Sequence, residues 1–233
     1  TIKQPYWNYI IMQEFSSVAE NYQKVKNNLT TNVQLVAVSK THPVESIQMV
    51  YNLGQKVFGE NKVQALIEKQ PQLPQDIQWH LIGHLQTNKV KYIAPFIDTI
   101  QSVDSEKILR EIDKQAKKND RKIKVFLQVK IAEEDTKYGL EIHETKELYL
   151  DYLNGQFPNV TISGLMGMAT FTGDKDQVKK EFSLLKNLYD QLSLKQKLDT
   201  LSMGMSDDYS LAIECGANSV RIGSAIFGRR DYT

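Results

Sequence analysis

The stretch Leu35-Val36-Ala37-Val38-Ser39-Lys40-Thr41 decides how the chain is expected to fold. Apolar residues lead directly towards a lysine, and Pro43 stops the run shortly afterwards. A short, continuous apolar run of this kind is typical of a strand buried in a parallel sheet. We therefore expect Lys40 to lie at the carboxyl end of a buried strand, where a loop begins.

Two interpretations of Lys40 follow from this position. The side chain can extend into solvent as an ordinary ammonium group, or it can point inward and be held away from water. An amine held away from water loses part of its preference for the charged form. A neutral amine is a nucleophile whose natural partner is an aldehyde. The second interpretation predicts that the rest of the chain builds a site for an aldehyde cofactor.

The alternation of strand and helix continues along the whole chain. A helix with an apolar stripe is expected over 5–29, before the first strand. Strands are expected at 33–39, 56–58, 77–82, 96–102, 123–129, 160–166, 199–203 and 219–222. Helices are expected between them at 43–53, 61–69, 87–92, 105–117, 143–153, 174–192 and 207–215, with a short one at 225–228.

This count of eight strand-then-helix units indicates the fold. Eight such units in a chain of about 250 residues are the signature of a (β/α)8 barrel, also called a TIM barrel. An open, doubly wound sheet also alternates strands and helices but usually has fewer units. No linker rich in proline, glycine or serine interrupts the pattern. We expect a single TIM-barrel domain over 1–233 with an additional N-terminal helix.

Composition excludes several classes of protein. The chain has 233 residues and a formal net charge of +1, so no global charge favours nucleic acid or membrane surfaces. Its hydrophobic share of 41% and charged share of 24% are ordinary for a globular protein. Cys215 is the single cysteine, which excludes an internal disulfide and a cysteine-rich metal site. With no long apolar span or signal peptide in the sequence, we expect a cytoplasmic protein.

In a barrel of this type, functional residues gather at the carboxyl ends of the strands. This rule selects Lys40 after the first strand and Asn61 after the second. It also selects His80 and Gly83 at the third strand and Met168 after the sixth. His80 is either a site residue or a packed, hydrogen-bonded one, and packing is the favoured role for Met168. His80 and His84 are four residues apart, but Gly83 and the strand keep them from forming a metal pair on a helix.

The loops after the seventh and eighth strands suit an anion. Barrels often bind phosphate with these loops and the start of a short helix. The seventh loop contains Gly204, expected to let the backbone approach a ligand, and Ser206. The eighth contains Gly223 and Ser224 at a helix start, with Arg221 just before them on the strand. A lysine, an arginine and a phosphate site together suit pyridoxal 5′-phosphate (PLP), although a phosphosugar aldolase would use the same lysine and phosphate site.

Several strings of residues carry a resemblance to a known family. They are Val36-Ala37-Val38-Ser39-Lys40-Thr41, Phe58-Gly59-Glu60-Asn61, Trp79-His80-Leu81-Ile82-Gly83, Leu85-Gln86-Thr87-Asn88-Lys89, Leu201-Ser202-Met203-Gly204-Met205-Ser206-Asp207-Asp208 and Val220-Arg221-Ile222-Gly223-Ser224-Ala225-Ile226-Phe227-Gly228. In this order they resemble the pyridoxal phosphate homeostasis protein family (YggS/PROSC type). That family is similar to the amino-terminal barrel of alanine racemase. The resemblance extends from about residue 35 to residue 230 and implies the same barrel fold.

The resemblance implies a role for six residues. Lys40 falls on the lysine that holds PLP as an internal aldimine, a Schiff base. Ser206, Gly223 and Ser224 fall on the phosphate-binding positions, and Ser224 keeps the hydroxyl of the threonine that is common there. Arg221 falls on the arginine that faces the pyridine nitrogen, and Asn61 falls on a residue near the ring. No metal-binding residue is implied.

The implied function is PLP (vitamin B6) homeostasis without turnover. A fixed arginine disfavours protonation of the pyridine nitrogen, and an unprotonated ring is a poorer electron sink. Racemases also need a second acid or base, which alanine racemase takes from another domain; this sequence ends at Thr233, so we expect no such domain here. The alternative is a single-domain PLP-dependent amino-acid racemase or lyase. We expect a monomer that binds PLP, with PLP-dependent apo-enzymes as candidate acceptors.

Overall fold

The parallel strands of the protein close into a barrel. The computed structural model describes residues 4–133 and 138–228, with side chains from Ser16 onward. Each strand pairs in parallel with the next one along the chain, and β1 pairs with β8. The strands are β1 (Gln34–Val38), β2 (Val57–Glu60), β3 (Gln78–Leu81), β4 (Thr99–Val103), β5 (Ile123–Gln128), β6 (Val160–Met166), β7 (Thr200–Ser202) and β8 (Ser219–Ile222).

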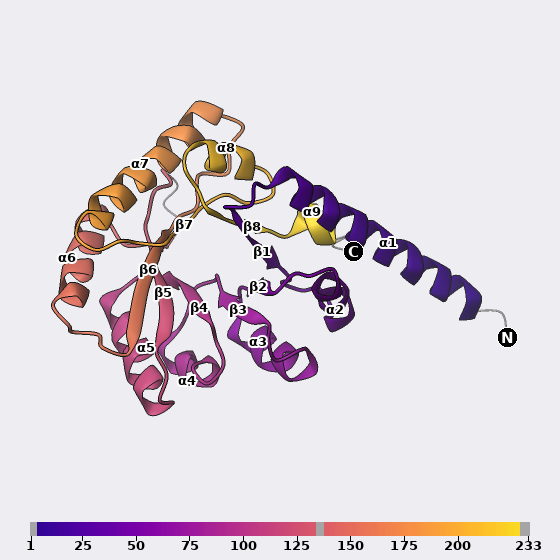
Figure 1. Cartoon of the computed structure of the whole chain (residues 1–233), viewed down its shortest axis with the longest axis horizontal. Coiled ribbons are helices and arrows are strands. Elements are labelled where there is room, and N and C mark those ends of the chain that lie inside the picture. The colour runs from indigo at the N-terminus through magenta and orange to yellow at the C-terminus, as the bar shows by residue number, and fades with distance from the viewer. Residues whose placement is uncertain (1–3, 134–137, 229–233) are drawn as a thin grey trace.

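Helices surround this barrel, as Figure 1 shows. Between successive strands lie α2 (Val44–Asn52), α3 (Val63–Lys69), α4 (Val90–Ile93), α5 (Glu106–Lys118), α6 (Ile142–Leu153), α7 (Lys175–Ser193) and α8 (Tyr209–Glu214). A short 3-10 turn, Gln70–Gln72, directly follows α3, and a second one, Thr87–Lys89, directly precedes α4. The predicted (β/α)8 barrel is therefore confirmed, while a single domain over 1–233 stays a prediction.

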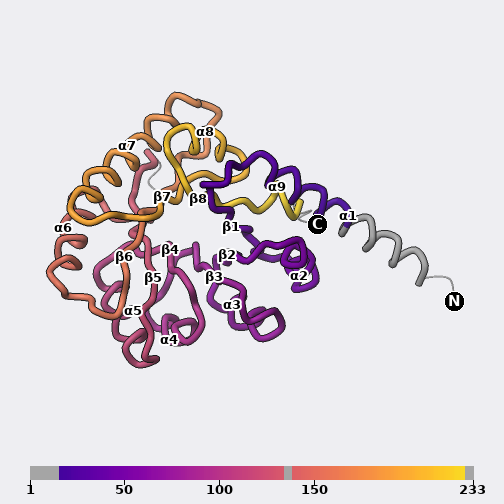
Figure 2. Tube along the Cα trace, viewed as in Figure 1, coloured from indigo at the N-terminus to yellow at the C-terminus, as the bar shows by residue number. Residues whose placement is uncertain are grey.

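The additional N-terminal helix, α1 (Gln4–Asn28), lies beside the last helix, α9 (Ser224–Phe227), and α2. Figure 2 follows the trace from α1 at one end of the chain to α9 near the other. Val18, Tyr22 and Val25 are buried, and Asn21 donates a hydrogen bond to the carbonyl of Ile226. The predicted apolar stripe thus packs α1 onto the barrel.

The fourth strand begins later than the sequence pattern predicted. The pattern predicted a strand over 96–102, but β4 starts at Thr99. Backbone hydrogen bonds from the amides of Phe96 and Ile97 to the carbonyl of Ile93 keep the preceding residues in a helical turn. Arg121 also donates to the carbonyl of Ile97, which fixes this turn below the strand.

Apolar side chains of the strands and helices form one core. Trp79 and Phe58 from β3 and β2 are almost fully buried, and their rings lie 6.1 Å apart. Within the described residues, no helix is long and apolar enough to cross a membrane.

A glycine on β6 accommodates an irregularity in the barrel. The register between β5 and β6 shifts between Val125 and Phe126, which is the mark of a β-bulge. Gly164 pairs with Phe126, and a Cβ atom there would lie 2.4 Å from the carbonyl oxygen of Thr200. Only glycine allows the backbone of β7 to approach this closely.

Replacing Gly164 with alanine should destabilise the protein. The added methyl group overlaps backbone, which cannot move aside as a flexible side chain does, so we expect a loss of about 1–3 kcal/mol. Chemical denaturation followed by far-UV circular dichroism measures this loss. Gly173→Ala is the matched control, because a Cβ atom there meets nothing within 4 Å. Equal stability of the two variants would contradict the role of Gly164.

Candidate functional site

A cavity of about 840 Å³ opens at the carboxyl ends of the strands. Its volume lies in the range typical of small-molecule sites. It is lined by Val38, Lys40, Thr41, His42, Asn61, Lys62, Ile82, Gly83, His84, Gln128, Tyr138, Met168, Phe171, Met205, Ser206, Asp207, Arg221, Gly223, Ser224 and Gly228. The six residues predicted to bind the cofactor all line this one cavity.

Pairing between the first and last strands brings these residues together. Val36 lies opposite Arg221, and Ala37 lies opposite Ile222. The loop after β1, which begins at Ser39, and the loop after β8, which begins at Gly223, therefore emerge side by side. Residues 181 positions apart in sequence, Lys40 and Arg221, consequently line the same cavity.

Lys40 lies at the edge of the cavity and is exposed. The interpretation of an amine held away from water is therefore not what the structure shows, because Lys40 lies beyond the end of β1 rather than in the barrel interior. The next residue, Thr41, has a φ of 64°, which is unusual for a β-branched residue. Its hydroxyl donates to the carbonyl of Lys40 at 2.6 Å. This tight turn sets the direction in which the chain leaves Lys40.

A buried ion pair holds the backbone immediately before Lys40. Glu60 is fully buried at the end of β2, and its Oε1 lies 2.6 Å from the Nζ atom of Lys69. Lys69 also donates to the carbonyl of Ser39 at 2.9 Å, and the Ser39 hydroxyl donates to Glu60 at 2.7 Å. Three elements, β1, β2 and α3, are thus tied together beneath Lys40.

Arg221 brings a buried positive charge to the cavity. Its residue is 3% exposed, and its guanidinium donates to the hydroxyl of Ser202 at 2.6 Å and to the carbonyl of Gly167 at 3.1 Å. Burial lowers the pKa of Arg221 to about 10, and the charge of Asp208 acts in the opposite direction. The group therefore stays charged at neutral pH and presents N–H donors to the cavity.

The loops after β7 and β8 meet as predicted. Ser206 accepts a hydrogen bond from the amide of Ala225 at 3.3 Å, which joins the seventh loop to the start of α9. The expected role of Gly204 differs, because its φ is 99° and a Cβ atom there would lie 2.6 Å from the Cβ atom of Ala212. Gly204 is needed for this turn and its packing on α8, and it does not line the cavity.

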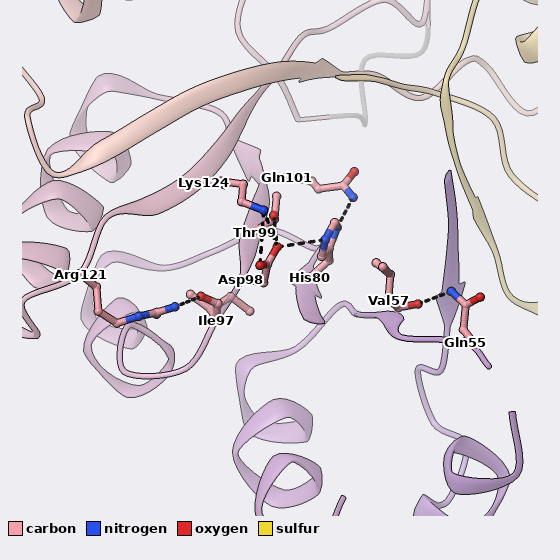
Figure 3. A network of polar contacts seen from close by, with 9 residues as sticks. All are labelled: Gln55, Val57, His80, Ile97, Asp98, Thr99, Gln101, Arg121 and Lys124. Carbon is pink, nitrogen blue, oxygen red and sulfur yellow. Dashed lines mark hydrogen bonds and ion pairs between the residues drawn. The ribbon is translucent and has the colours of Figure 1, made fainter. Parts of the chain in front are cut away.

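His80 is a packed residue and not a lining one. It is 2% exposed and lies between Gln101 and Asp98, as Figure 3 shows. The packing role favoured for Met168 is wrong, because Met168 lies beyond β6 and lines the cavity. Among the side chains that the structure describes, no group of three or more histidine, cysteine or acidic residues is arranged to hold a metal ion.

Sequence reasoning did not identify the aromatic side of the cavity. Tyr138 and Phe171 line it and are strongly exposed, with Phe171 at 83%. The Tyr138 ring stacks on the His84 imidazole at 4.4 Å, and Nδ1 of His84 lies 2.8 Å from a carboxylate oxygen of Asp104. These residues lie in the loops after β3, β4, β5 and β6. The rule that functional residues follow barrel strands applies to them, but no sequence motif marks these particular residues.

A buried carboxylate fixes two of these loops. Glu181 on α7 is 3% exposed and accepts hydrogen bonds from the amide and hydroxyl of Thr170, the amide of Glu133 and the side chain of Gln177. Burial alone would raise the pKa of Glu181, but these hydrogen bonds outweigh it and lower the pKa. The loops after β5 and β6 are therefore held together through one side chain.

The closed barrel, with a lysine after β1 and serine- and glycine-containing loops after β7 and β8, defines a class of protein. It is the barrel class of the alanine racemase N-terminal domain, and the model of the family described as "Alanine racemase, N-terminal domain" matches residues 14–231. Alanine racemase from Clostridium difficile has this fold, with a TM-score of 0.78 at 17% identity. The match covers 92% of this chain and 57% of the racemase chain.

Two further proteins are similar over nearly their whole length. The pyridoxal phosphate homeostasis protein of Pasteurella multocida is 38% identical over 234 residues, covering 96% of this chain and 99% of the relative. The structure of PipY from Synechococcus elongatus with PLP bound has a TM-score of 0.82 at 35% identity, covering 91% of this chain and 100% of PipY. The chain belongs to the pyridoxal phosphate homeostasis protein family, which confirms the resemblance found in the sequence.

The loop-clamping role of Glu181 predicts a pH-dependent stability. Because its pKa is lowered on folding, the carboxylate stabilises the protein above the ordinary glutamate pKa of 4.5, and this contribution is lost as the pH falls through the lowered value. Glu181→Gln should cost about 1–3 kcal/mol at pH 7 by leaving donors unmatched. The difference from the parent protein should shrink in acid.

Denaturation at pH 7 and at a series of pH values below 4.5 measures this effect. The exposed Glu147→Gln on α6 is the matched control and should show no such loss. A Glu181→Gln penalty that stays constant across this pH range would exclude the proposed carboxylate role.

Proposed function

We propose that this protein binds PLP in the cavity between the loops of β1, β7 and β8, and serves PLP homeostasis by holding it without turning over a substrate. The observation that carries this proposal is the joint placement of Lys40, Arg221 and the Ser206–Ser224 loops in one cavity. Family membership and the PLP-bound structure of PipY support it. A cytoplasmic monomer that passes PLP to apo-enzymes belongs to the same proposal.

The residues present fit each part of the cofactor. Gly223 and Ser224 lie at the start of α9, and Ser206 from the seventh loop is hydrogen-bonded to Ala225 there, so hydroxyl and backbone N–H groups suited to a phosphate come together. The exposed amine of Lys40 supplies the nucleophile that binds the aldehyde covalently. The buried guanidinium of Arg221 has hydrogen bonds to two neutral acceptors, which leaves it suited to donate to the ring nitrogen. Asn61 lines the wall near Gly83 and suits a contact with the ring.

The same arginine favours holding over turnover. Bound PLP acts as an electron sink when its ring nitrogen is protonated. A fixed positive charge at that nitrogen disfavours its protonation. Arg221 is held in place by its buried position on β8, and it stays charged because burial lowers its pKa only to about 10. The site therefore supports binding more than the stabilisation of negative charge on a substrate.

One observation favours the alternative, a PLP-dependent amino-acid racemase or lyase. His84 lines the cavity, and Asp104 orients its ring through Nδ1, which leaves Nε2 for proton transfer. Incubation of the pure protein with L- and D-amino acids, followed by chiral analysis, tests this alternative. Robust turnover that Asp104→Asn abolishes would replace the holding function by catalysis.

Lys40→Ala should remove covalent PLP binding and leave the fold intact. We expect the parent protein to show the absorbance of bound PLP and, after borohydride reduction, to gain the mass of one pyridoxyl phosphate on Lys40. The variant should gain none, and its melting temperature should change little because Lys40 is exposed. Lys62→Ala, which removes another lysine of the cavity, is the matched control. Label on Lys62 in place of Lys40 would overturn the assignment, and no pyridoxyl label at all would restore the aldolase alternative.

Ser224→Ala tests the phosphate position separately. Loss of one hydrogen bond to a charged group costs about 1.5–3 kcal/mol, so PLP affinity should fall by about tenfold or more. Affinity for pyridoxal, which lacks the phosphate, should not change. Fluorescence titration of both ligands against both proteins gives the comparison. An equal loss for the two ligands would place Ser224 away from the phosphate.

A further inference from the structure

The interior of the barrel contains a continuous line of polar side chains, which we call the interior network: Arg221, Ser202, Gln101, His80 and Asp98. The Arg221 guanidinium lies 2.6 Å from the Ser202 hydroxyl, and that hydroxyl lies 2.6 Å from Oε1 of Gln101. Nε2 of Gln101 lies 2.8 Å from Nδ1 of His80. Nε2 of His80 lies 3.5 Å from a carboxylate oxygen of Asp98.

This network joins the two ends of the barrel. Arg221 lines the cavity at the carboxyl ends of the strands. Asp98 immediately precedes β4, and its neighbour Lys124 is the second residue of β5, so both lie at the amino ends. Figure 3 shows the part of the network from Gln101 through His80 to Asp98 and Lys124. A positive group at the cavity is thus connected to a negative group at the opposite end.

The donors and acceptors of the network fit only one orientation when His80 is neutral. Ser202 accepts from Arg221 and donates to the carbonyl oxygen of the Gln101 amide. The amide nitrogen then donates to Nδ1 of His80, which leaves the imidazole proton on Nε2, facing Asp98. A reversed amide would need the imidazole proton on Nδ1, which would turn the lone pair of Nε2 towards the Asp98 carboxylate, and it would leave the Ser202 hydroxyl without its acceptor. Every dipole consequently points from Arg221 towards Asp98.

The surroundings of His80 keep it neutral. Burial lowers the pKa of His80, and Asp98 opposes this effect only in part, while Lys124 adds to it. Two further neighbours carry no charge: the Gln101 amide on β4 and the ring of Phe126 on β5, whose centroid lies 6.4 Å from that of His80. Partial burial pushes the pKa of Asp98 upward, but hydrogen bonds from His80 and Thr99 and the charge of Lys124 hold it well below its usual range. Asp98 is therefore a fixed negative end.

We propose that Ser202, Gln101, His80 and Asp98 are positioning residues that hold the Arg221 guanidinium in one place at the cavity and set the charge it presents there. Arg221 donates to two neutral groups, the Ser202 hydroxyl and the Gly167 carbonyl. A hydroxyl with no acceptor of its own is free to rotate, whereas the Ser202 hydroxyl is fixed by its hydrogen bond to Gln101. A fully satisfied buried network rigidifies its members, because every rearrangement leaves a polar group unpaired. The proposal rests on the proposed function in one respect, which is that Arg221 faces the ring nitrogen of bound PLP.

Gln101→Glu tests the proposal by replacing the side-chain amide nitrogen with a carboxylate oxygen of nearly the same size. The new carboxylate lies between Ser202 and His80, so it should draw a proton onto Nδ1 and raise the pKa of His80. Long-range ¹H–¹⁵N NMR of the ligand-free protein measures this directly. The chain has only four histidines, so His80 is readily assigned with a His80→Gln sample. We expect the parent His80 to stay neutral with its proton on Nε2 at pH 7, and the Gln101→Glu His80 to be doubly protonated.

The second measurement uses the PLP-loaded protein. The carboxylate at position 101 lies next to Ser202 and closer along the network to Arg221 than the added charge of His80, so it partly offsets the charge of Arg221 and the ring nitrogen should protonate more easily. The midpoint of the pH titration of the bound-PLP absorbance should therefore shift upward by about one unit. Ser202→Ala, which removes the direct contact to Arg221 without adding charge, should also shift the midpoint upward and serves as the second variant if Gln101→Glu does not fold.

Gln55→Leu is the matched control. Gln55 is another buried glutamine, drawn separately in Figure 3, and it donates to the carbonyls of Leu35 and Val57 outside the interior network. The Gln55→Leu change should lower stability without changing the protonation of His80 or the midpoint of the bound-PLP titration. A parent His80 with its proton on Nδ1, or a PLP titration that neither Gln101→Glu nor Ser202→Ala shifts, would overturn the proposal. Failure of the parent protein to bind PLP would overturn the proposed function instead, while the NMR result would still decide the network.

Discussion

Hydrogen bonding between β1 and β8 is the constraint on which the site depends. In an open sheet with the same sequential strand order, the first and last strands would lie at opposite edges. Here the barrel closes, and Val36 pairs with Arg221. The loop after the first strand consequently faces the loops after the last two. The lysine and the residues suited to an anion share a cavity only because of this closure.

The polar interior distinguishes this barrel from one packed by apolar layers alone. TIM barrels are usually filled by layers of branched apolar side chains. Here the strands also bury three polar residues almost completely in the barrel: Gln101, Ser202 and Arg221. Burying such groups is costly unless each one is hydrogen-bonded, so their arrangement is strongly restricted. Hydrogen-bonded polar groups, including the charged guanidinium of Arg221, therefore lie beneath the cavity in place of apolar side chains.

The comparisons give one set of proteins that share only the fold of this chain and another set that share its family. The likeness to alanine racemase at 17% identity concerns the fold alone. The family relationship rests on relatives that match along almost their whole length, as for the protein of Pasteurella multocida. A shared barrel therefore says nothing of whether a cofactor is held or used, and within this chain that question concerns the residues of the cavity. In this protein the relevant groups are the buried Arg221 and His84, which both line the cavity, and Asp104, which is paired with His84.

The sequence by itself determined the barrel and the positions from which the site is built. Apolar runs followed by Lys40, Asn61 or Gly223 mark strand ends, because a buried parallel strand and a solvated loop need different residues. Only the tertiary structure decided which side chains reach the cavity and which support it. His80 is a buried connector, Met168 lines the wall, Lys40 is exposed, and Tyr138 joins His84 across two loops. These outcomes depend on barrel closure and on hydrogen bonds between residues distant in sequence, such as Glu181 with Thr170, and local residue patterns carry no information about such contacts.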